Sequence, residues 1–257
     1  MRGVILAAGR GVRLNGHSAD TPKCLIPVGN ETLLSRNVRM LREAGIDEIL
    51  VVIGCAAETV RQQCRGVTFV HNEVFATTNS LYSLWLTRSF LGSGFVVMNC
   101  DVLLHPQLLL DLLTAHVEDA ALVAYRDQDT ILGAEEMKVR VRGGRIIAMS
   151  KTMAPEEADA ENVGVVKFGP DGARLLVGEM DALVTAGERR AWAPRAFEAF
   201  ARRRPLHAVG TRGYPWIEID FPEDYRRAVE VVLPQIESSG ALAPDRVLAP
   251  ARVARSA

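Results

Sequence analysis

The sequence is poor in cysteine and contains no apolar run long enough to cross a membrane. Its four cysteines, Cys24, Cys55, Cys64 and Cys100, are scattered and form no C-x-x-C pair. That pattern argues against a disulfide framework or a zinc site, and it predicts a reducing, cytoplasmic location. No apolar run approaches the roughly 18 residues of a transmembrane helix. A signal peptide is not expected either, because glycine and arginine follow the first apolar run almost at once.

An excess of charge of either sign is also missing. The formal net charge is −1, from 30 lysines and arginines against 31 aspartates and glutamates. Without a global positive field, neither nucleic acid nor a membrane surface is an expected partner. The 257 residues, 48% of them apolar, suffice for one large α/β domain. We expect this domain at 1–236 and a flexible tail at 237–257, which is rich in small residues and proline and has no periodicity.

Apolar runs and helical spacing alternate along the first 70 residues. Strands are predicted at 4–7, 48–53 and 67–70, with helices at 32–44 and 57–64 between them. Such alternation is typical of a parallel sheet with crossover helices. The later pattern predicts a hairpin around 143–144, a polar loop at 152–162, and further strands and helices. Those strands are expected at 94–98, 120–124, 163–168, 206–209 and 216–219, and the helices at 80–91, 105–116, 171–183, 194–203 and 223–233.

The first strand runs into a loop that combines glycines with two cations. Gly9 and Gly11 let backbone N–H groups approach phosphate oxygens, and Arg13 and Lys23 add positive charge. The loop is not a Walker A motif, since no GK[ST] closes it, and it lacks the third glycine of the dinucleotide fingerprint. An ordinary tight turn explains the glycines about equally well. The two cations favour a nucleoside-triphosphate site at the carboxyl end of the strand.

Three carboxylates are candidates for a Mg²⁺ site. Asp101 follows the buried strand at 94–98, where a charge is costly unless it is paired or binds a cation. Glu218 and Asp220 alternate with isoleucines in WIEID, so they share one face of a strand. Magnesium takes carboxylates together with substrate phosphates. The simpler alternatives are a helix cap for Asp101 and a solvated edge for the other two, and periodicity does not place the three together.

Several further residues have an ordinary alternative. Lys138 and Lys151 lie in or just past the predicted hairpin, and taken alone they are most simply solvated lysines. Trp192 fits either a core or a ligand-binding position. The arginines at 189–190, 195 and 202–204 are most simply exposed helix faces, with anion binding as the minority interpretation.

Taken in order, these segments resemble the nucleotidyltransferases that activate phosphorylated metabolites with a nucleoside triphosphate. The match covers most of the chain up to about Leu233, and its middle part is most similar to CTP:phosphocholine and phosphonate cytidylyltransferases. The resemblance implies a glycosyltransferase-A-like Rossmann fold: a mixed, mostly parallel sheet flanked by helices, with a small hairpin-containing acceptor region. The matching pieces are LAAGRGVRL, PKCLIPV, LREAGIDEILVVIG, TTNSLYSLWL, NCDVLL, EEMKVRV, SK, ENVGVVKF and WIEID.

The resemblance also implies roles for individual residues. Nucleotide binding falls to the backbone of Leu6, Ala7, Ala8 and Gly9, to Gly11, and to Asn79 and Ser80. Catalytic positive charge comes from Lys23 and Arg13 at the triphosphate and from Lys151 at the acceptor phosphate. Asp101, Asp220 and Glu218 hold Mg²⁺, and Lys138, Glu161 and Trp192 are acceptor-binding candidates.

Three positions depart from the family pattern. Val12 replaces a small hydroxyl residue, Cys100 replaces a glycine, and AWAPRAF around Trp192 lacks an acidic residue that phosphocholine enzymes tend to carry. With arginines nearby, we therefore expect a phosphonate or another small anionic phosphoryl acceptor, with CTP as donor. A sugar-1-phosphate uridylyl- or thymidylyltransferase and a non-catalytic nucleotide-binding regulatory domain are the alternatives. A homodimer is a possible assembly.

Overall fold

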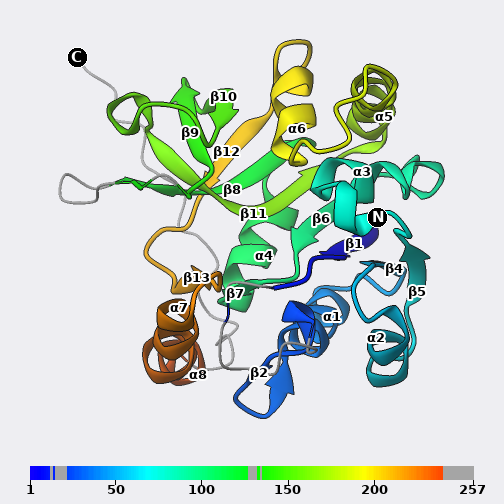
Figure 1. Cartoon of the computed structure of the whole chain (residues 1–257). Helices are drawn as coiled ribbons and strands as arrows, with labels where there is room; N and C mark the ends of the chain where they lie inside the picture. The colour runs from blue at the N-terminus through cyan, green and yellow to red at the C-terminus, as the bar shows by residue number, and fades with distance from the viewer. Residues whose placement is uncertain (12–13, 15–21, 127–131, 134, 240–257) are drawn as a thin grey trace, which may run out of the picture.

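A mixed sheet forms the centre of the computed structural model, which describes residues 1–11, 14, 22–126, 132–133 and 135–239 (Figure 1). Within these residues the sheet has nine strands in the order β5-β4-β1-β6-β11-β8-β12-β10-β9. Its strands are β1 Arg2–Ala7, β4 Ile49–Ile53, β5 Thr68–His71, β6 Phe95–Asn99, β8 Ala120–Tyr125, β9 Lys138–Arg142, β10 Arg145–Ser150, β11 Ala160–Phe168 and β12 His207–Gly210.

The strands that carry the opening motifs are parallel neighbours. β1 pairs in parallel with β4 on one side and with β6 on the other, and β5 continues the parallel set. The long strand β11 then lies antiparallel between β6 and β8. The loops after β1 and β6 therefore leave the sheet at the same edge, where open α/β sheets bind ligands.

Helices cover both faces of the sheet, as Figure 1 shows. On one face α3 Ser80–Trp85, α5 Pro170–Thr185 and α6 Pro194–Ala201 bury residues against β1 and β6. On the other face α1 Leu33–Glu43, α2 Ala57–Gln63 and α4 Pro106–Thr114 do the same. Alternation along β1 serves both layers, because Val4 and Leu6 belong to the first core and Ile5 and Ala7 to the second.

A third, smaller core supports the segments around Lys23 and Asp220. It joins the short hairpin of β2 Pro27–Val28 and β3 Glu31–Thr32 to the pair β7 Val102–Leu104 and β13 Trp216–Glu218. The C-terminal helices α7 Pro222–Arg227 and α8 Leu233–Ser238, linked by a π-helical turn at Ala228–Val232, complete it. Ile26, Ile217 and Ile219 are among its buried members, so the segments that carry Lys23 and Asp220 pack into the same core.

Several predicted boundaries differ from the structure. The predicted helix at 80–91 ends at Trp85 and gives way to a 3₁₀ turn at Arg88–Phe90, because Thr87 turns its hydroxyl to the Leu84 carbonyl. The predicted loop at 152–162 contains a 3₁₀ turn at Pro155–Glu157, and β11 already begins at Ala160. None of the helices in the described stretches combines the length and the apolar character needed to cross a membrane.

Candidate active site

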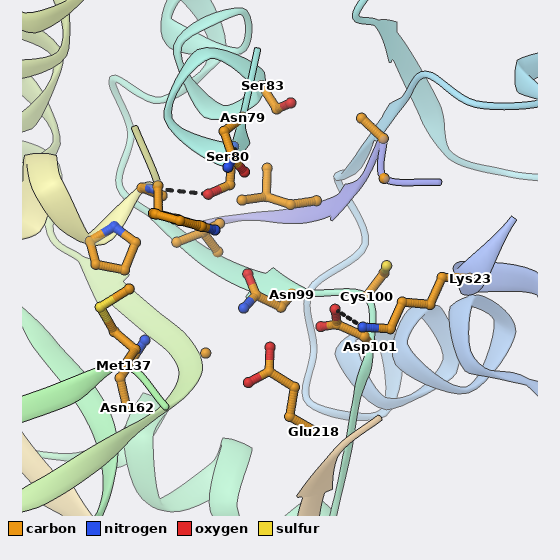
Figure 2. Close-up of a pocket in the computed structure, with 18 of the residues that line it drawn as sticks. Lys23, Asn79, Ser80, Ser83, Asn99, Cys100, Asp101, Met137, Asn162 and Glu218 are labelled. Carbon is orange, nitrogen blue, oxygen red and sulfur yellow. Dashed lines mark hydrogen bonds and ion pairs between the residues drawn. The ribbon is translucent and has the colours of Figure 1, made fainter. Parts of the chain in front are cut away.

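A cavity of about 220 Å³ lies at the carboxyl edge of β1 and β6 (Figure 2). The ends of these strands contribute Leu6, Ala8, Gly9, Asn99, Cys100 and Asp101 to its wall. Residues from the start of α3, from the hairpin and from β11, β13 and α6 close the rest. They include Asn72, Phe75, Asn79, Ser80, Glu135, Met137, Lys151, Asn162, Gly164, Trp192, Phe197, Glu218 and Asp220, together with Lys23.

Pairing of β7 with β13 brings the three predicted metal carboxylates together. Val102 lies opposite Glu218 in this antiparallel pair, and the Ile219 N–H donates to the Asp101 carbonyl at 3.0 Å. One oxygen from each of Asp101, Glu218 and Asp220 lies within 4.8 Å of the others. The alternation in WIEID thus places two acids on one face, and the strand pairing carries that face to Asp101.

Lys23 lies between two of these carboxylates. Its Nζ is 2.7 Å from Asp101 Oδ2 and 2.5 Å from Asp220 Oδ1, and Figure 2 shows the contact with Asp101. Burial alone lowers the pKa of Lys23, but the two carboxylates outweigh it and raise the pKa above its ordinary value. Lys23 is therefore a permanent cation at this point of the wall.

The carboxylate cluster fits a divalent cation. Asp101 Oδ1 is buried and has no hydrogen-bond partner among the described residues, although its second oxygen is bound by Lys23. Burial raises the pKa of Glu218 well above its ordinary value, and the charges of Asp101 and Asp220 raise it further. A hard cation relieves both problems, since it satisfies the orphaned oxygen and neutralises the like charges.

Hydrogen bonds to the backbone of Cys100 fix the strand end that carries Asp101. The Cys100 N–H donates to the Leu6 carbonyl at 3.2 Å, and the Asn37 side chain donates to the Cys100 carbonyl at 3.2 Å. The Cys100 side chain is buried in the second core. Cysteine in place of the family's glycine is thus accommodated by packing.

The predicted nucleotide residues occupy two different layers. Leu6, Ala8 and Gly9 line the cavity, whereas the Ala7 side chain packs in the core on the opposite face. Asn79 caps α3 through a bond from the Ser80 N–H. The Ser80 hydroxyl accepts from the Ala193 N–H at 2.8 Å, which ties α3 to the chain before α6 (Figure 2).

Gly11 serves the placement of Lys23 rather than lining the cavity. Its φ of +64° favours glycine, and a Cβ there would lie 2.8 Å from the Cβ of Lys23. The close approach of these two backbones therefore requires glycine. Val12 and Arg13 lie outside the described residues.

Of the four acceptor-binding candidates, two line the cavity and two do not. Lys151 and Trp192 line the cavity, with Lys151 Nζ 5.1 Å from the Trp192 ring centroid and 3.6 Å from a Glu135 oxygen. Lys138 is buried and directs its Nζ to backbone carbonyls. Burial raises the pKa of Glu161 to about 7, with a further contribution from Glu136.

No arginine of the described wall faces the cavity. Arg195 pairs with Glu188 and Glu198, and Arg202 also pairs with Glu198. Arg190 lies 3.4 Å from the Thr77 carbonyl, and Arg203 and Arg204 pair with further acids. These arginines therefore do not support the expectation that arginines near Trp192 bind an acceptor with extra negative charge. The expected helix faces are confirmed only for Arg195 on α6, since 189–190 and 202–204 lie in turns before and after that helix.

Several wall residues were not among the residues predicted from the sequence. Asn99 lies two positions before Asp101 at the end of β6, so strand alternation could have indicated it. Phe75, Met137, Asn162 and Phe197 come from segments that only the folded chain brings together. Asn162 is 6% exposed, and its Oδ1 has no partner among the described residues.

The fold and the site define a nucleotide-handling α/β domain, and comparison with known proteins gives its family. The chain matches the MobA-like NTP transferase domain over residues 3–212, and it belongs to this nucleotidyltransferase family.

Curated relatives include choline-phosphate cytidylyltransferase of Streptococcus pneumoniae, 25% identical over 90% of this chain and 98% of that protein. The CMP-5'-(3-aminopropyl)phosphonate synthase of Streptomyces rubellomurinus is 34% identical over 52% of this chain. A bifunctional IPC transferase and DIPP synthase of Rubrobacter xylanophilus is 31% identical over 89% of this chain. The matches span only 22% and 51% of the last two proteins, respectively.

Solved structures confirm the Rossmann-like fold. The CTP:phosphocholine cytidylyltransferase of S. pneumoniae superposes with a TM-score of 0.73, at 23% identity, over 90% of this chain and 98% of that one. The inositol-1-phosphate CTP transferase of T. maritima gives a TM-score of 0.75 at 19% identity, covering 94% and 98%.

Proposed function

We propose that this nucleotidyltransferase is a Mg²⁺-dependent cytidylyltransferase, which transfers CMP from CTP to a small phosphonate or phosphorylated metabolite. The observation that carries the proposal is the cluster of Lys23, Asp101, Asp220 and Glu218 in a cavity that Lys151 also lines. The cytidylyltransferases among the relatives support CTP as the donor.

The chemistry requires two anions to meet. An acceptor phosphoryl oxygen is already ionised at pH 7 and needs no general base. It attacks the α-phosphorus of CTP, a bond forms between them, and the bond from the α-phosphorus to the leaving pyrophosphate breaks. Lys23 and Lys151, which both line the cavity, supply positive charge that lowers the repulsion and orients the reactants.

Asp101, Asp220 and Glu218 are the residues that would hold Mg²⁺, which supplies charge neutralisation at the phosphates when bound. Leu6, Ala8 and Gly9, with Asn79 and Ser80, form the proposed nucleotide wall. Arg13 stays a prediction from the sequence as a further phosphate ligand.

The acceptor end favours a molecule with a hydrogen-bond donor. The buried Asn162 Oδ1 has no partner among the described residues, and a buried acceptor left unpaired costs about 1–3 kcal/mol. Lys151 already lies near the ring of Trp192, so the aromatic surface that a quaternary ammonium needs is shared. We therefore place small phosphonates or phosphate esters with an N–H or O–H group ahead of phosphocholine.

Pyrophosphate release tests the proposal in a matrix of donors and acceptors. CTP, UTP, dTTP and ATP are each combined with amino- and hydroxyalkylphosphonates, phosphocholine and sugar 1-phosphates, with and without Mg²⁺. We expect turnover with CTP and a small phosphonate or phosphate ester, only in the presence of Mg²⁺. Turnover confined to UTP or dTTP with sugar 1-phosphates would instead establish the uridylyl- or thymidylyltransferase alternative. Nucleotide binding without pyrophosphate release under any condition would indicate a regulatory domain.

The variant Asp101→Ala tests the assignment of the site. It should lower turnover by about 100-fold or more, because it removes one proposed metal ligand and one partner of Lys23. Circular dichroism should show an unchanged fold. Near-normal turnover of this variant would contradict the assignment of the site.

A further inference from the structure

Lys138 is a buried cation that no step of the proposed reaction uses. It begins β9, is 1% exposed, and is among the largest fully buried side chains of the described chain. Its Nζ donates to the Lys151 carbonyl at 2.9 Å and lies 3.5 Å from the Glu136 carbonyl. A buried ammonium is unfavourable unless its protons are bound, so these contacts hold Lys138 in one place.

The bond to Lys151 crosses the open end of the β9–β10 hairpin. Ser150 is the register partner of Lys138, and Lys151 is the first residue beyond β10. The ladder between the two strands has ended there, so it does not restrain the Lys151 peptide group. The Lys138 side chain restrains the carbonyl of this peptide group from inside the sheet, while its N–H, that of Thr152, donates to the Ser150 hydroxyl at 3.1 Å.

The restrained backbone carries the cation at the acceptor end of the cavity. The Lys151 ammonium lies between the Trp192 ring, at 5.1 Å, and a Glu135 oxygen, at 3.6 Å. Both contacts are loose, so they leave the ammonium free to meet a ligand and do little to fix its backbone. We propose that Lys138 is a positioning residue, which holds the Lys151 backbone where the Lys151 ammonium can contact the acceptor phosphoryl group. This inference rests on the proposed function.

The chain provides a matched control in Lys167. This lysine is 3% exposed, and its Nζ donates to the carbonyls of Leu113 and Ala115 at 3.3 and 3.0 Å. Neither carbonyl belongs to a residue that lines the cavity. Lys167→Met thus removes the same type of buried contact as Lys138→Met, away from the acceptor.

The experiment measures steady-state kinetics and thermal unfolding of Lys138→Met, Lys167→Met and Lys151→Met, with CTP and the acceptor found in the screen. We expect both buried-lysine variants to lose stability. Lys138→Met alone of these two should raise the acceptor KM, by about tenfold or more, because small misplacements of a binding group are costly. The KM for CTP should stay within about twofold, since Lys151 lies at the acceptor end.

The double variant Lys138→Met/Lys151→Met tests whether Lys138 acts through Lys151. If it does, the second substitution adds little to the acceptor KM of Lys151→Met. Additive effects of the two substitutions on the acceptor KM would overturn the positioning role. So would a Lys138→Met variant that changes the KM for the acceptor and the KM for CTP equally, if Lys167→Met shows the same changes. If Lys138→Met does not fold, Lys138→Arg keeps N–H donors at this position and should retain an acceptor KM near that of the wild type. A tenfold rise in that variant despite a wild-type melting temperature would contradict the inference.

The outcomes also separate this inference from the proposed function. An unchanged acceptor KM in Lys151→Met would remove Lys151 from the acceptor site and refute the proposed function at that residue. An unchanged value in Lys138→Met beside a raised value in Lys151→Met would refute only the positioning role.

Discussion

The ammonium nitrogen of Lys23 lies 2.7 Å from Asp101 Oδ2 and occupies part of the space between the clustered carboxylates. It contacts Asp220 at 2.5 Å as well, so one lysine neutralises two of the three proposed metal ligands. A divalent cation held by these carboxylates would therefore compete with the Lys23 ammonium for the same oxygens. The displaced ammonium would then be available to the triphosphate.

Lys23→Met should separate these two roles. We expect Mn²⁺ alone to bind more tightly to this variant than to the wild type, because the competing cation is gone. Turnover should nevertheless fall by about 100-fold or more, since a charge at the phosphates is lost. Titration calorimetry measures the first effect and pyrophosphate release the second.

Lys151→Met is the control for the metal titration, because it removes a cation of the same cavity that lies against Trp192 and Glu135 instead of between the carboxylates. Its affinity for Mn²⁺ alone should match the wild type. Weaker Mn²⁺ binding in Lys23→Met would show that Lys23 supports the metal site instead of competing for it.

Asp224 should influence the metal site through the turn after β13. Its Oδ2 accepts the backbone N–H groups of Asp220 and Phe221, at 3.0 and 2.8 Å, and thereby shapes the chain that carries the Asp220 carboxylate. Asp224→Ala should weaken Mn²⁺ binding severalfold and raise the Mg²⁺ concentration needed for turnover. Asp224→Asn keeps an acceptor oxygen and should restore most of both properties.

Glu223→Gln is the control for Asp224, since it changes an exposed acid on the same turn of α7. It should leave Mn²⁺ binding and turnover unchanged. Equal losses in Asp224→Ala and Glu223→Gln would attribute the effect to negative charge near the site, and the hydrogen bonds would then be unimportant.

The sequence could predict the edge at which the site forms, because parallel strands share their direction. The glycine loop follows β1 and Asp101 follows β6, and these strands are parallel neighbours. Alternation also placed Glu218 and Asp220 on one face. Their approach to Asp101 could not be predicted in this way, since it depends on the β7–β13 pairing of segments that lie far apart in sequence.

Single residues that depend on tertiary packing were harder to predict. Lys138 alternates like an exposed residue of a hairpin strand, yet β9 also contacts β11, and Lys138 pairs in register with Glu161. This second neighbour buries the lysine. Arg195 on α6 and Arg202 just after it lie close to the cavity in sequence only, because they pair with Glu188 and Glu198.

Gly11→Ala should reduce both stability and activity, because two effects combine at this position. The φ of +64° disfavours alanine, and the new Cβ would approach Lys23 Cβ at 2.8 Å and Lys23 Cα at 3.3 Å. A left-handed non-glycine residue costs about 1–3 kcal/mol, and the contact adds displacement of the Lys23 segment. Chemical denaturation and pyrophosphate release measure the two consequences.

Gly45→Ala is the matched control, since Gly45 has a φ of +81° but a Cβ there would meet no heavy atom of the described residues within 4 Å. It should lose similar backbone stability and keep wild-type turnover. Equal turnover in Gly11→Ala and Gly45→Ala would show that the close approach to Lys23 is not needed for catalysis.

Glu161 should make the protein less stable as the pH rises toward neutrality. Burial raises its pKa to about 7, with Glu136 adding to the rise and Lys138 opposing it, and it also faces the charge of Glu218. Between pH 4.5 and pH 7 the folded protein holds a proton that the unfolded chain has released, so the free energy of unfolding falls as the pH increases. Urea unfolding of the wild type and Glu161→Gln at pH 5 and pH 8 should therefore show the variant gaining relative stability, by up to about 3 kcal/mol, at the higher pH. A constant difference between the two proteins across this range would show that Glu161 titrates normally, and a variant that loses relative stability at pH 8 would show that its ionised form is stabilised by Lys138.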